Sequence, residues 1–285
     1  MSACLEVRVR GIGFWAPRLP DWQTACAVLA GRAEPEAVAR SRPTPALLAP
    51  TERRRAPDTV SIALEAASRA CEAAGVDPVS LPSVFACTHG DGAINDYLCG
   101  TLASNPLLCS PTRFHNSVHN AAAGYWTIGT GCVKPSTALT AGSETFAAGL
   151  LEAIVQALAD ETPVLYVAYD AAMPGPVGEV SPSAGMIASA LVVEPLKGHG
   201  PGVRPAGVGR CLRARVAPGA QAMPEASVSP GSIPHAWFAA LPANSMRQCL
   251  PLLALLASDA EGRMQMQLNQ GCVLEVDIEE VTTHG

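Results

Sequence analysis

Apolar and polar residues alternate along the chain with two different periods. Residues 5–10 alternate strictly, which is the pattern of a half-buried strand, and we predict a first strand over about residues 5–14. A helix follows later, with Asp58 or Thr59 as its expected cap and Gly75 as its end. Its apolar positions recur with helical spacing at Val60, Leu64, Ala67, Cys71 and Ala74.

Short apolar runs alternate with further helical segments. We predict strands in "SVFACTHG", "STALTA", "PVLYVAYDAA" and "AGMIASALVVEP", and helices in "AINDYLCGTLAS" and "GYWTIGTG". The helix after "STALTA", which we expect to be a buried strand, repeats Phe146, Leu150, Ile154 and Leu158 every fourth position. Strands separated by helices of ten or more residues predict a layered α/β fold with helices on both faces of the sheet.

The composition changes after this α/β segment, which we place at residues 1–195. Residues 196–244 are rich in Gly and Pro, and we interpret them as a connection that contains one strand, "RCLRARVA". Residues 245–285 are predicted to form a helix over about 245–259 and strands over about 263–268 and 272–278. This C-terminal portion is interpreted as a reduced remnant of a second α/β half.

Bulk properties exclude several classes of function. The chain has 285 residues, of which 48% are hydrophobic, and a formal net charge of −6, which argues against nucleic acid as the main partner. The N-terminus lacks a signal-like segment, and the apolar run "LPLLALLA" is too short to span a bilayer, so we expect a cytoplasmic protein without a membrane span.

No cofactor or metal site is expected. The ten cysteines include no C-x-x-C pair and no pairing with a nearby His at zinc-ligand spacing, so we interpret them as buried free thiols. Gly90 and Gly92 lack the G-x-G-x-x-G spacing of a nucleotide-binding loop.

One segment is highly specific. Residues 110–124 read "SPTRFHNSVHNAAAG", and "PSTALTAGSETFAAGLLEA" follows after ten residues. The segment from Ser110 to Glu152 resembles ketosynthases of the thiolase superfamily, which have S-P-x-x-F-x-x-S-V-x-N-x-x-A-G, then a helix, a Pro-Ser pair, a buried strand and a nucleophilic Cys at a helix N-terminus. The chain is similar to the short chain-length factors of aryl polyene clusters. The resemblance implies a thiolase-like layered α/β fold with a mixed sheet, comprising one complete half and a reduced C-terminal portion.

Ser143 stands where a ketosynthase has its Cys. A thiol titrates near 8.5, and a helix N-terminus can bring it into the physiological range, whereas a hydroxyl stays protonated and needs a general base. Ketosynthases supply that base from their second half. Downstream of Ser143 this chain has only His199, His235 and His284, and we interpret the G-H-x-x-G match at His199 as coincidence.

A hydrolase elbow, G-x-S-x-G, is also excluded, because Ala141 and Thr145 flank Ser143 at the two glycine positions. We therefore interpret Ser143 as a vacated nucleophile position. On this interpretation its side chain caps the following helix, and Glu144 stabilises the first turn through the helix dipole.

In the relatives that the chain resembles, the segment around Phe114 lies at a dimer interface, near the acyl pocket of the partner. The resemblance implies that an interface and tunnel set lines or caps this pocket: Phe114, Asn116, Ser117, Val118, His119, Asn120, His89, Tyr97 and Leu98. The plainer alternative is that Asn116 and Asn120 bond loop backbone, and that His115 and His119 are satisfied interface groups.

The function implied is that of a non-catalytic subunit that pairs with a full-length ketosynthase in polyketide or polyene chain elongation. "ERRR" at residues 52–55 is a candidate contact for an acidic acyl carrier protein, and a solvated loop is the alternative. Two other functions stay open, a serine acyltransferase or thioesterase that uses Ser143 and a homodimeric binding or scaffold protein.

Overall fold

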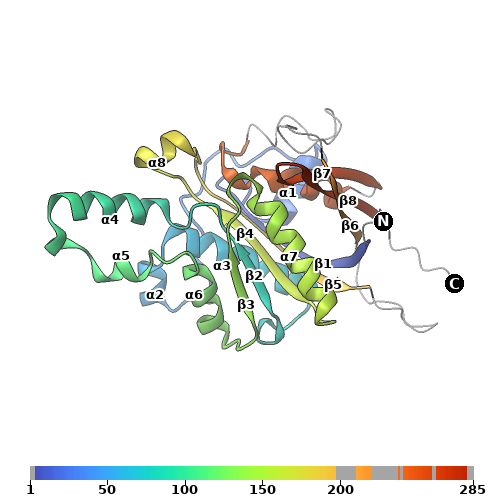
Figure 1. Ribbon diagram of the computed structural model, residues 1–285, viewed down its shortest axis with the longest axis horizontal. Helices are drawn as coiled ribbons and strands as arrows, with labels where there is room; N and C mark the ends of the chain where they lie inside the picture. Colours follow the sequence, from blue (N-terminus) through green and yellow to red (C-terminus); the bar gives the residue numbers. More distant parts are fainter. Residues whose placement is uncertain (1–3, 197–209, 220–236, 238–239, 259–260, 281–285) are drawn as a thin grey trace.

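The computed structural model describes residues 4–196, 210–219, 237, 240–258 and 261–280 (Figure 1). The first half of the chain contains β1 (Leu5–Trp15), α1 (Trp22–Leu29), α2 (Pro50–Arg55), α3 (Asp58–Ala74), η1 (Pro78–Ser80), β2 (Ser83–Ala86), α4 (Gly92–Ser104), η2 (Pro106–Leu108), α5 (Pro111–His115), α6 (Ala121–Thr130) and β3 (Ser136–Leu139). The second half contains η3 (Gly142–Glu144), α7 (Thr145–Ala159), β4 (Val164–Asp170), α8 (Gly175–Val180), β5 (Ile187–Pro195), β6 (Arg210–Pro218), η4 (Ser245–Cys249), α10 (Leu250–Ala257), β7 (Gly262–Asn269) and β8 (Cys272–Glu280).

The described strands form one mixed sheet in the order β3-β2-β4-β5-β1-β6-β8-β7. β2 pairs in parallel with β3 and β4, and the other neighbouring strands pair antiparallel. The carboxyl ends of the three parallel strands therefore lie at one edge of the sheet, where α/β proteins commonly bind ligands.

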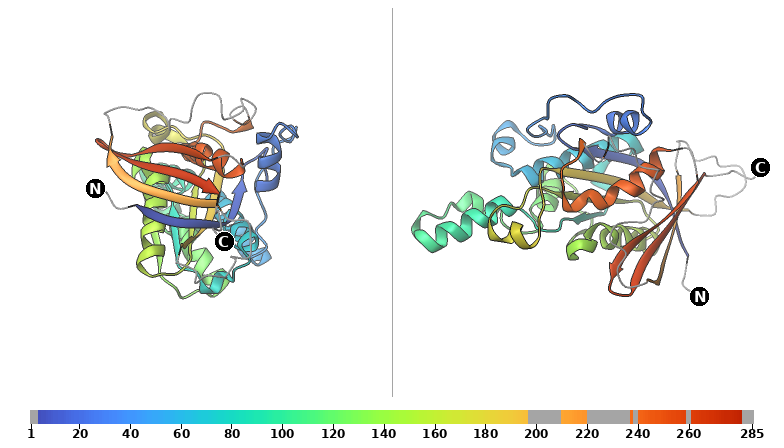
Figure 2. Two further views of the ribbon diagram at one scale, coloured as in Figure 1. Left: turned by 90° about the vertical axis from the view of Figure 1, so that its right-hand side faces the viewer. Right: turned by 90° about the horizontal axis from the view of Figure 1, so that it is seen from above.

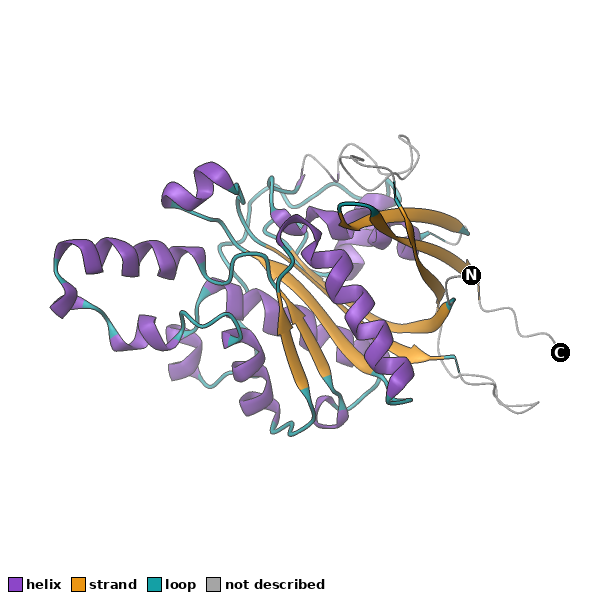
Figure 3. Ribbon diagram, viewed as in Figure 1, coloured by secondary structure: helices purple, strands orange, loops and turns teal. Residues whose placement is uncertain are grey.

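Helices cover both faces of the sheet (Figure 3). α3 and α6 pack on one face, and α1, α7 and α10 pack on the other, so that the sheet separates two apolar cores. β4 contributes to both cores by alternation, with Tyr166 on one face and Val167 on the other. The predicted layered α/β fold is confirmed.

Small side chains bring α3 unusually close to β1. A Cβ atom added to Gly13 would lie 1.9 Å from the carbonyl oxygen of Ala66 on α3. Gly11, two positions earlier, is similarly close to Ala70. The scarcity of aromatic residues is thus matched by helix–sheet packing through glycine and alanine rather than by large side chains.

Several predicted elements are confirmed and two details are wrong. Gly75, at a φ of 64°, ends α3 as expected, but its N-cap is Pro57 and no side chain caps the helix. β3 is not buried, because it lies at the edge of the described sheet with β2 as its one neighbour there, and its side chains range from half-buried to exposed.

The strands expected near the C-terminus are β6, β7 and β8, and the expected helix is η4 with α10. The three strands continue the same sheet beyond β1 instead of forming a separate sheet. The interpretation of this portion as the remnant of a second half stays a prediction.

Residues 92–116 project from the sheet as an arm (Figure 1). The arm consists of α4, η2 and α5, which contact mainly one another. A second view shows that it extends away from the sheet, at the opposite end of the molecule from β6, β7 and β8 (Figure 2). In the part of the chain that the structure describes, no helix is long and apolar enough to cross a membrane.

Candidate functional site

Ser143 lies between the carboxyl end of β3 and the start of α7. The chain turns there through Gly142, whose φ of 60° favours glycine, and enters η3. The Ser143 side chain is exposed and its hydroxyl donates to Glu144 Oε1 at 2.8 Å. Its carbonyl oxygen accepts from Gln248 Nε2 of η4.

The expectation that Ser143 caps the helix is wrong. Thr145 serves that turn instead, because its hydroxyl donates to the Gly142 carbonyl at 2.7 Å and accepts from the Ala141 N–H at 2.9 Å. Glu144 carries no cap bond of its own, and its carboxylate binds the Ser143 hydroxyl.

No imidazole serves Ser143 among the described residues. His89 and His119 both bond elsewhere, and His115 is exposed at the end of α5. His199, His235 and His284 lie outside the described residues. Among the described residues, the one side chain that bonds the hydroxyl is the Glu144 carboxylate. A carboxylate is a weak base for a hydroxyl, and serine nucleophiles are ordinarily activated by an adjacent general base such as an imidazole.

A buried polar cluster lies at the carboxyl ends of β2 and β4. Asp170, the last residue of β4, is 0% exposed, and its Oδ2 accepts from the Thr88 N–H at 2.9 Å and the Ser245 hydroxyl at 2.5 Å. Its Oδ1 accepts from the Cys87 thiol, at 3.5 Å, and from no other group of the described residues. Burial raises the pKa of that thiol well above its ordinary value, so Cys87 stays a protonated donor.

The side chain of His89 is largely buried and lies next to this cluster. Its Nε2 lies 2.8 Å from the hydroxyl of Ser181, and its Nδ1 lies 3.7 Å from Asp170 Oδ1. Nδ1 is buried and has no hydrogen-bond partner among the residues that the structure describes. His119 also has its partner within this chain, because its Nε2 lies 2.8 Å from the Cys87 carbonyl oxygen. Thr140 links this region to the turn before Ser143 by donating to the Thr88 carbonyl at 3.0 Å.

Most of the remaining interface and tunnel set lies on the arm or at its base. Phe114 is 70% exposed and Val118 is 52% exposed. Tyr97 lies under the guanidinium of Arg113, 3.8 Å from its ring centre, and its hydroxyl donates to the Leu108 carbonyl at 3.2 Å. The Ser117 hydroxyl donates to the Phe114 carbonyl, and Leu98 is half-buried on α4.

Asn116 and Asn120 do not behave as the plainer alternative expects. Asn116 is 2% exposed and its Oδ1 is buried without a partner, although its side chain bonds the Tyr125 hydroxyl. This bond lowers the Tyr125 pKa, but burial has the larger effect and raises it. Asn120 precedes α6 without making a side-chain cap bond.

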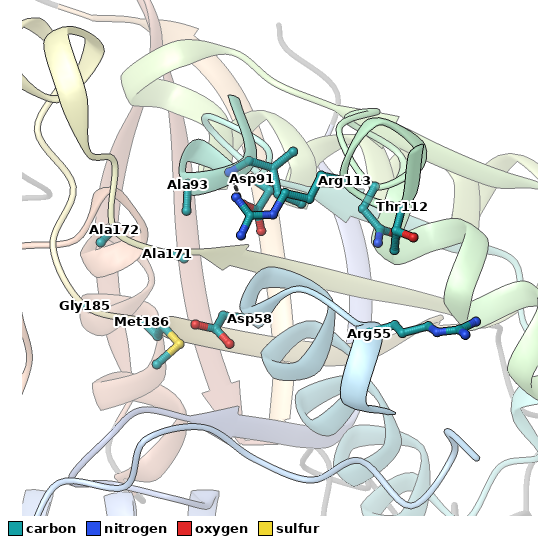
Figure 4. A pocket seen from close by; sticks show the side chains of 12 residues that line it. Arg55, Asp58, Asp91, Ala93, Thr112, Arg113, Ala171, Ala172, Gly185 and Met186 are labelled. Carbon is teal, nitrogen blue, oxygen red and sulfur yellow. Dashed lines mark hydrogen bonds between the residues drawn. The ribbon is translucent and has the colours of Figure 1, made fainter. Parts of the chain in front are cut away.

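A cavity of about 420 Å³ lies at the base of the arm (Figure 4). It is bounded by α2, the starts of α3 and α4, α5 and the two ends of the segment 171–186 that links β4 to β5. The residues that line it are Arg55, Asp58, Asp91, Ala93, Ile94, Thr112, Arg113, Asn116, Ala171, Ala172, Gly185 and Met186.

The basic cluster at residues 52–55 belongs to the short helix α2 rather than to a loop. Arg53 donates to the Leu48 carbonyl at 2.8 Å, and Arg55 lies 3.8 Å from Glu52. Arg54 is exposed, so at least one guanidinium of the cluster faces solvent.

The ten cysteines are all free, and five of them are buried. Burial raises the pKa of Cys71 and of Cys249 to about 12. Among the described residues, no group of three or more His, Cys, Asp or Glu side chains is arranged to hold a metal ion.

A comparison with protein-family models matches residues 22–227 to the family "Beta-ketoacyl synthase, N-terminal domain". The chain belongs to this β-ketoacyl synthase family. The identification made from residues 110–152 is thereby confirmed. A search of curated proteins gave no match.

Three solved structures are similar to this β-ketoacyl synthase family member over nearly its whole length. The ketosynthase ApeO in complex with its chain length factor ApeC, from Xenorhabdus doucetiae, gives a TM-score of 0.68 at 22% identity and covers 96% of this chain and 99% of its own. The ishigamide ketosynthase/chain length factor gives 0.66 at 13% identity, with 97% and 99% covered.

The third structure is AntDE:AntF, a type II polyketide synthase acyl-carrier protein in complex with its ketosynthase bound to the hexaketide. It gives a TM-score of 0.67 at 11% identity and covers 98% of this chain and 100% of its own. At these identities the three comparisons establish the fold, and the thiolase-like layered architecture is confirmed.

The sequence reasoning missed the polar cluster of this family member. No sequence motif indicates Asp170, Ser181 or Ser245 as candidate residues, and the family resemblance assigns His89 to the interface and tunnel set. One signal was present, because Asp170 is a charged residue at the end of an otherwise apolar buried strand, "VLYVAYD". A buried charge requires partners, and such residues mark candidate sites.

Proposed function

We propose that this chain is a non-condensing, chain-length-factor-like subunit. It pairs with a full-length β-ketoacyl-ACP synthase that elongates polyketide, aryl polyene or fatty-acid-like chains on an acyl carrier protein. Support comes from the family match and from the likeness to solved complexes whose names contain a ketosynthase with a chain length factor or an acyl-carrier protein.

The observation that carries the proposal is the state of Ser143. The position that the family resemblance assigns to the nucleophilic Cys holds an exposed hydroxyl whose only side-chain partner among the described residues is the neighbouring Glu144 carboxylate. A helix N-terminus stabilises an anion by about 1 kcal/mol, less than one pKa unit, which cannot ionise a hydroxyl. The condensing Cys and its His partners then come from the ketosynthase.

Uncovered apolar surface favours a partner. Seven of the twelve large apolar side chains that are exposed in the described residues lie within residues 102–133: Leu102, Leu107, Leu108, Phe114, Val118, Ile128 and Val133. The edge strand β3 follows this segment, and one side of its backbone is unpaired in the described sheet. Apolar patches and open strand edges are features that partner subunits cover.

Within this complex, we assign the floor of the acyl tunnel to the exposed side chains Phe114 and Val118, with Tyr97 and Leu98 behind them. His89 is the least suited member of the set, because the contacts of its own chain hold it. The exposed arginines of α2 are the proposed contact for the acyl carrier protein, since a positive patch steers an acidic partner.

The test is reconstitution with the ketosynthase and acyl carrier protein of the same gene neighbourhood. The isolated chain should form no condensation product, and peptide mapping after incubation with acyl-carrier-protein thioesters should find no acyl group on Ser143. Ser143→Ala should leave condensation by the complex unchanged. An acyl adduct that maps to Ser143 and is lost in Ser143→Ala would establish the serine acyltransferase or thioesterase function instead.

Tunnel length is tested separately. Phe114→Ala removes an exposed ring from the proposed floor, so the complex should release longer products while the first condensation is largely unaffected. Tyr97→Ala should act in the same direction. Unchanged product lengths from an assembled complex would contradict a measuring role and leave only stabilisation of the ketosynthase.

A homodimeric scaffold is the second candidate, because the same apolar arm can pack against another copy of this chain. Sedimentation of the chain with and without the co-expressed ketosynthase distinguishes the two functions. A tight 1:1 heterodimer supports the proposal, and a homodimer that ignores the ketosynthase contradicts it.

A further inference from the structure

In the buried cluster at the carboxyl ends of β2 and β4, two polar atoms that face each other lack a strong hydrogen-bond partner in the described part of the chain. Among the described residues, Asp170 Oδ1 has only the Cys87 thiol as a donor, at 3.5 Å, and a thiol is a weak donor. His89 Nδ1 is buried, has no hydrogen-bond partner in the described part of the chain, and lies 3.7 Å from the same oxygen. A buried carboxylate and a buried ring nitrogen both require partners, and a small approach of His89 would satisfy both.

This pairing fixes the tautomer of His89. With the proton on Nδ1 facing Asp170, Nε2 is the acceptor of the ring. The hydroxyl of Ser181 lies 2.8 Å from Nε2 and therefore donates to it. A serine hydroxyl bonded to an imidazole that a buried carboxylate orients is the arrangement that activates serine nucleophiles in acyl transfer.

We propose that Ser181, His89 and Asp170 form a second site, which transfers acyl groups from esters or thioesters to water through a covalent serine ester. The site is independent of Ser143 and of condensation. The residues come from three separate segments, the turn after β2, the end of β4 and the loop after α8, so the fold and not a local motif assembles them.

The chemistry balances without an added oxidant or cofactor. Ser181 Oγ attacks the acyl carbon while its proton passes to His89 Nε2, and the carbon–sulfur or carbon–oxygen bond breaks as His89 returns the proton to the leaving thiol or alcohol. Water then attacks the serine ester and gives a proton to His89, which returns it to Ser181 Oγ. The products are a carboxylic acid and a free thiol or alcohol.

The geometry is that of a resting site. Ser181 is half-buried, and His89 has 8% of its side chain exposed, so the nucleophile is the most accessible member and the orienting Asp170 is sealed. The 3.7 Å separation is long for a hydrogen bond, but catalytic hydrogen bonds are often long before a substrate binds. The segment 171–186, which carries Ser181, also lines the cavity at the base of the arm through Ala171, Ala172, Gly185 and Met186.

The first test is covalent labelling of the full-length chain by a fluorophosphonate, followed by peptide mapping. The wild type should carry one label on Ser181, and Ser181→Ala should lose it. Ser80→Ala is the matched control, because Ser80 is an exposed serine that precedes the amino end of β2, whereas His89 follows the carboxyl end. The Ser80→Ala variant should be labelled like the wild type. No label on folded wild-type protein, or a label that maps to another serine, overturns the proposal.

The second test measures hydrolysis of p-nitrophenyl butyrate and of the butyryl thioester of N-acetylcysteamine. Ser181→Ala should fall to the rate without protein, and His89→Gln should lose at least about 100-fold, the usual contribution of a general base. Asp170 is a positioning residue, so Asp170→Asn should lower kcat and leave KM unchanged, whereas misfolding would lower the folded fraction in circular dichroism. Hydrolysis that is unchanged in Ser181→Ala overturns the proposal and leaves the pairing with a ketosynthase untouched.

Discussion

The sheet with its packed helices and the arm differ in where their apolar side chains go. On α7, Phe146, Leu150 and Ile154 are each 0–1% exposed, whereas on the arm Leu107 is 93% and Phe114 is 70% exposed. The same kind of residue therefore contributes folding free energy in one region and stays in solvent in the other. The sheet is stable through its own contacts, and the arm presents a surface that a second protein can bury.

A matched pair of Phe→Ala variants gives the largest expected contrast. Phe146 lies against Tyr166, with ring centres 5.6 Å apart, and Phe146→Ala should lower the free energy of unfolding by about 3–5 kcal/mol. Phe114→Ala should change it by less than about 0.5 kcal/mol in the isolated chain, since no core is disturbed. Urea unfolding measures both values.

The outcome that would break the contrast is a similar loss for both variants, which would mean that the arm is part of the folded core. When binding to the ketosynthase is measured instead of unfolding, Phe114→Ala should have the larger effect of the two variants. Phe114→Ala should weaken the complex, and any Phe146→Ala that remains folded should bind normally.

Cysteine alkylation gives a second contrast. Cys99 is exposed on the arm, whereas Cys249 is buried and its pKa is raised to about 12 by burial. At pH 8 a thiol with that pKa is thiolate in about one molecule in ten thousand, and only the thiolate reacts. N-ethylmaleimide should therefore modify Cys99 at least about 100-fold faster than Cys249, as read by peptide mass.

The same reagent maps the partner surface. Cys99 should become protected when the ketosynthase binds, and the exposed Cys4 beside β1 should not. Equal reactivity of Cys99 in the free chain and in the complex would place the interface elsewhere.

Glycine-to-alanine variants form a third pair. Gly13→Ala drives a methyl group into the backbone of α3 and should cost at least about 1–3 kcal/mol. Gly100 lies inside α4, and among the described residues no atom beyond the backbone of its own helix turn lies within 4 Å of the place that an added methyl group would take. Gly100→Ala should therefore stabilise that helix by about 0.5–1 kcal/mol. Global unfolding reports the first change, and slower hydrogen exchange in α4 reports the second; faster exchange would contradict it.

The smallest effect is expected within the arm. Arg113 lies over the ring of Tyr97 at 3.8 Å, and an exposed contact of this kind contributes about 0.5–1 kcal/mol. Arg113→Gln should raise hydrogen exchange in residues 92–116 and leave the global unfolding midpoint unchanged. A shift of the midpoint would show that the arm and the sheet unfold together.

Sequence patterns predicted the fold because secondary structure leaves a local trace. Apolar residues at every fourth position up to Leu158 predicted α7. The glycine after Ala74 predicted the end of α3, and the apolar run before Asp170 predicted β4. The burial of β3 was predicted wrongly, because an apolar run does not reveal whether a strand has one neighbour or two.

That position 143 holds a hydroxyl and not a thiol was determined by the sequence alone, since the residue type sets the chemistry available to the side chain regardless of its surroundings. The partners of Ser143 were decided only by the tertiary structure. The side chain that bonds the backbone of this turn is that of Thr145 and not that of Ser143. The Ser143 carbonyl accepts a hydrogen bond from Gln248, which is 105 positions away in the sequence.

The polar cluster was likewise decided by tertiary structure. His89 and Ser181 are 92 positions apart, and parallel pairing of β2 with β4 places the turn after β2 beside Asp170. Local patterns report which face of an element is apolar, but hydrogen bonds between distant side chains depend on strand order and register, which no single segment encodes.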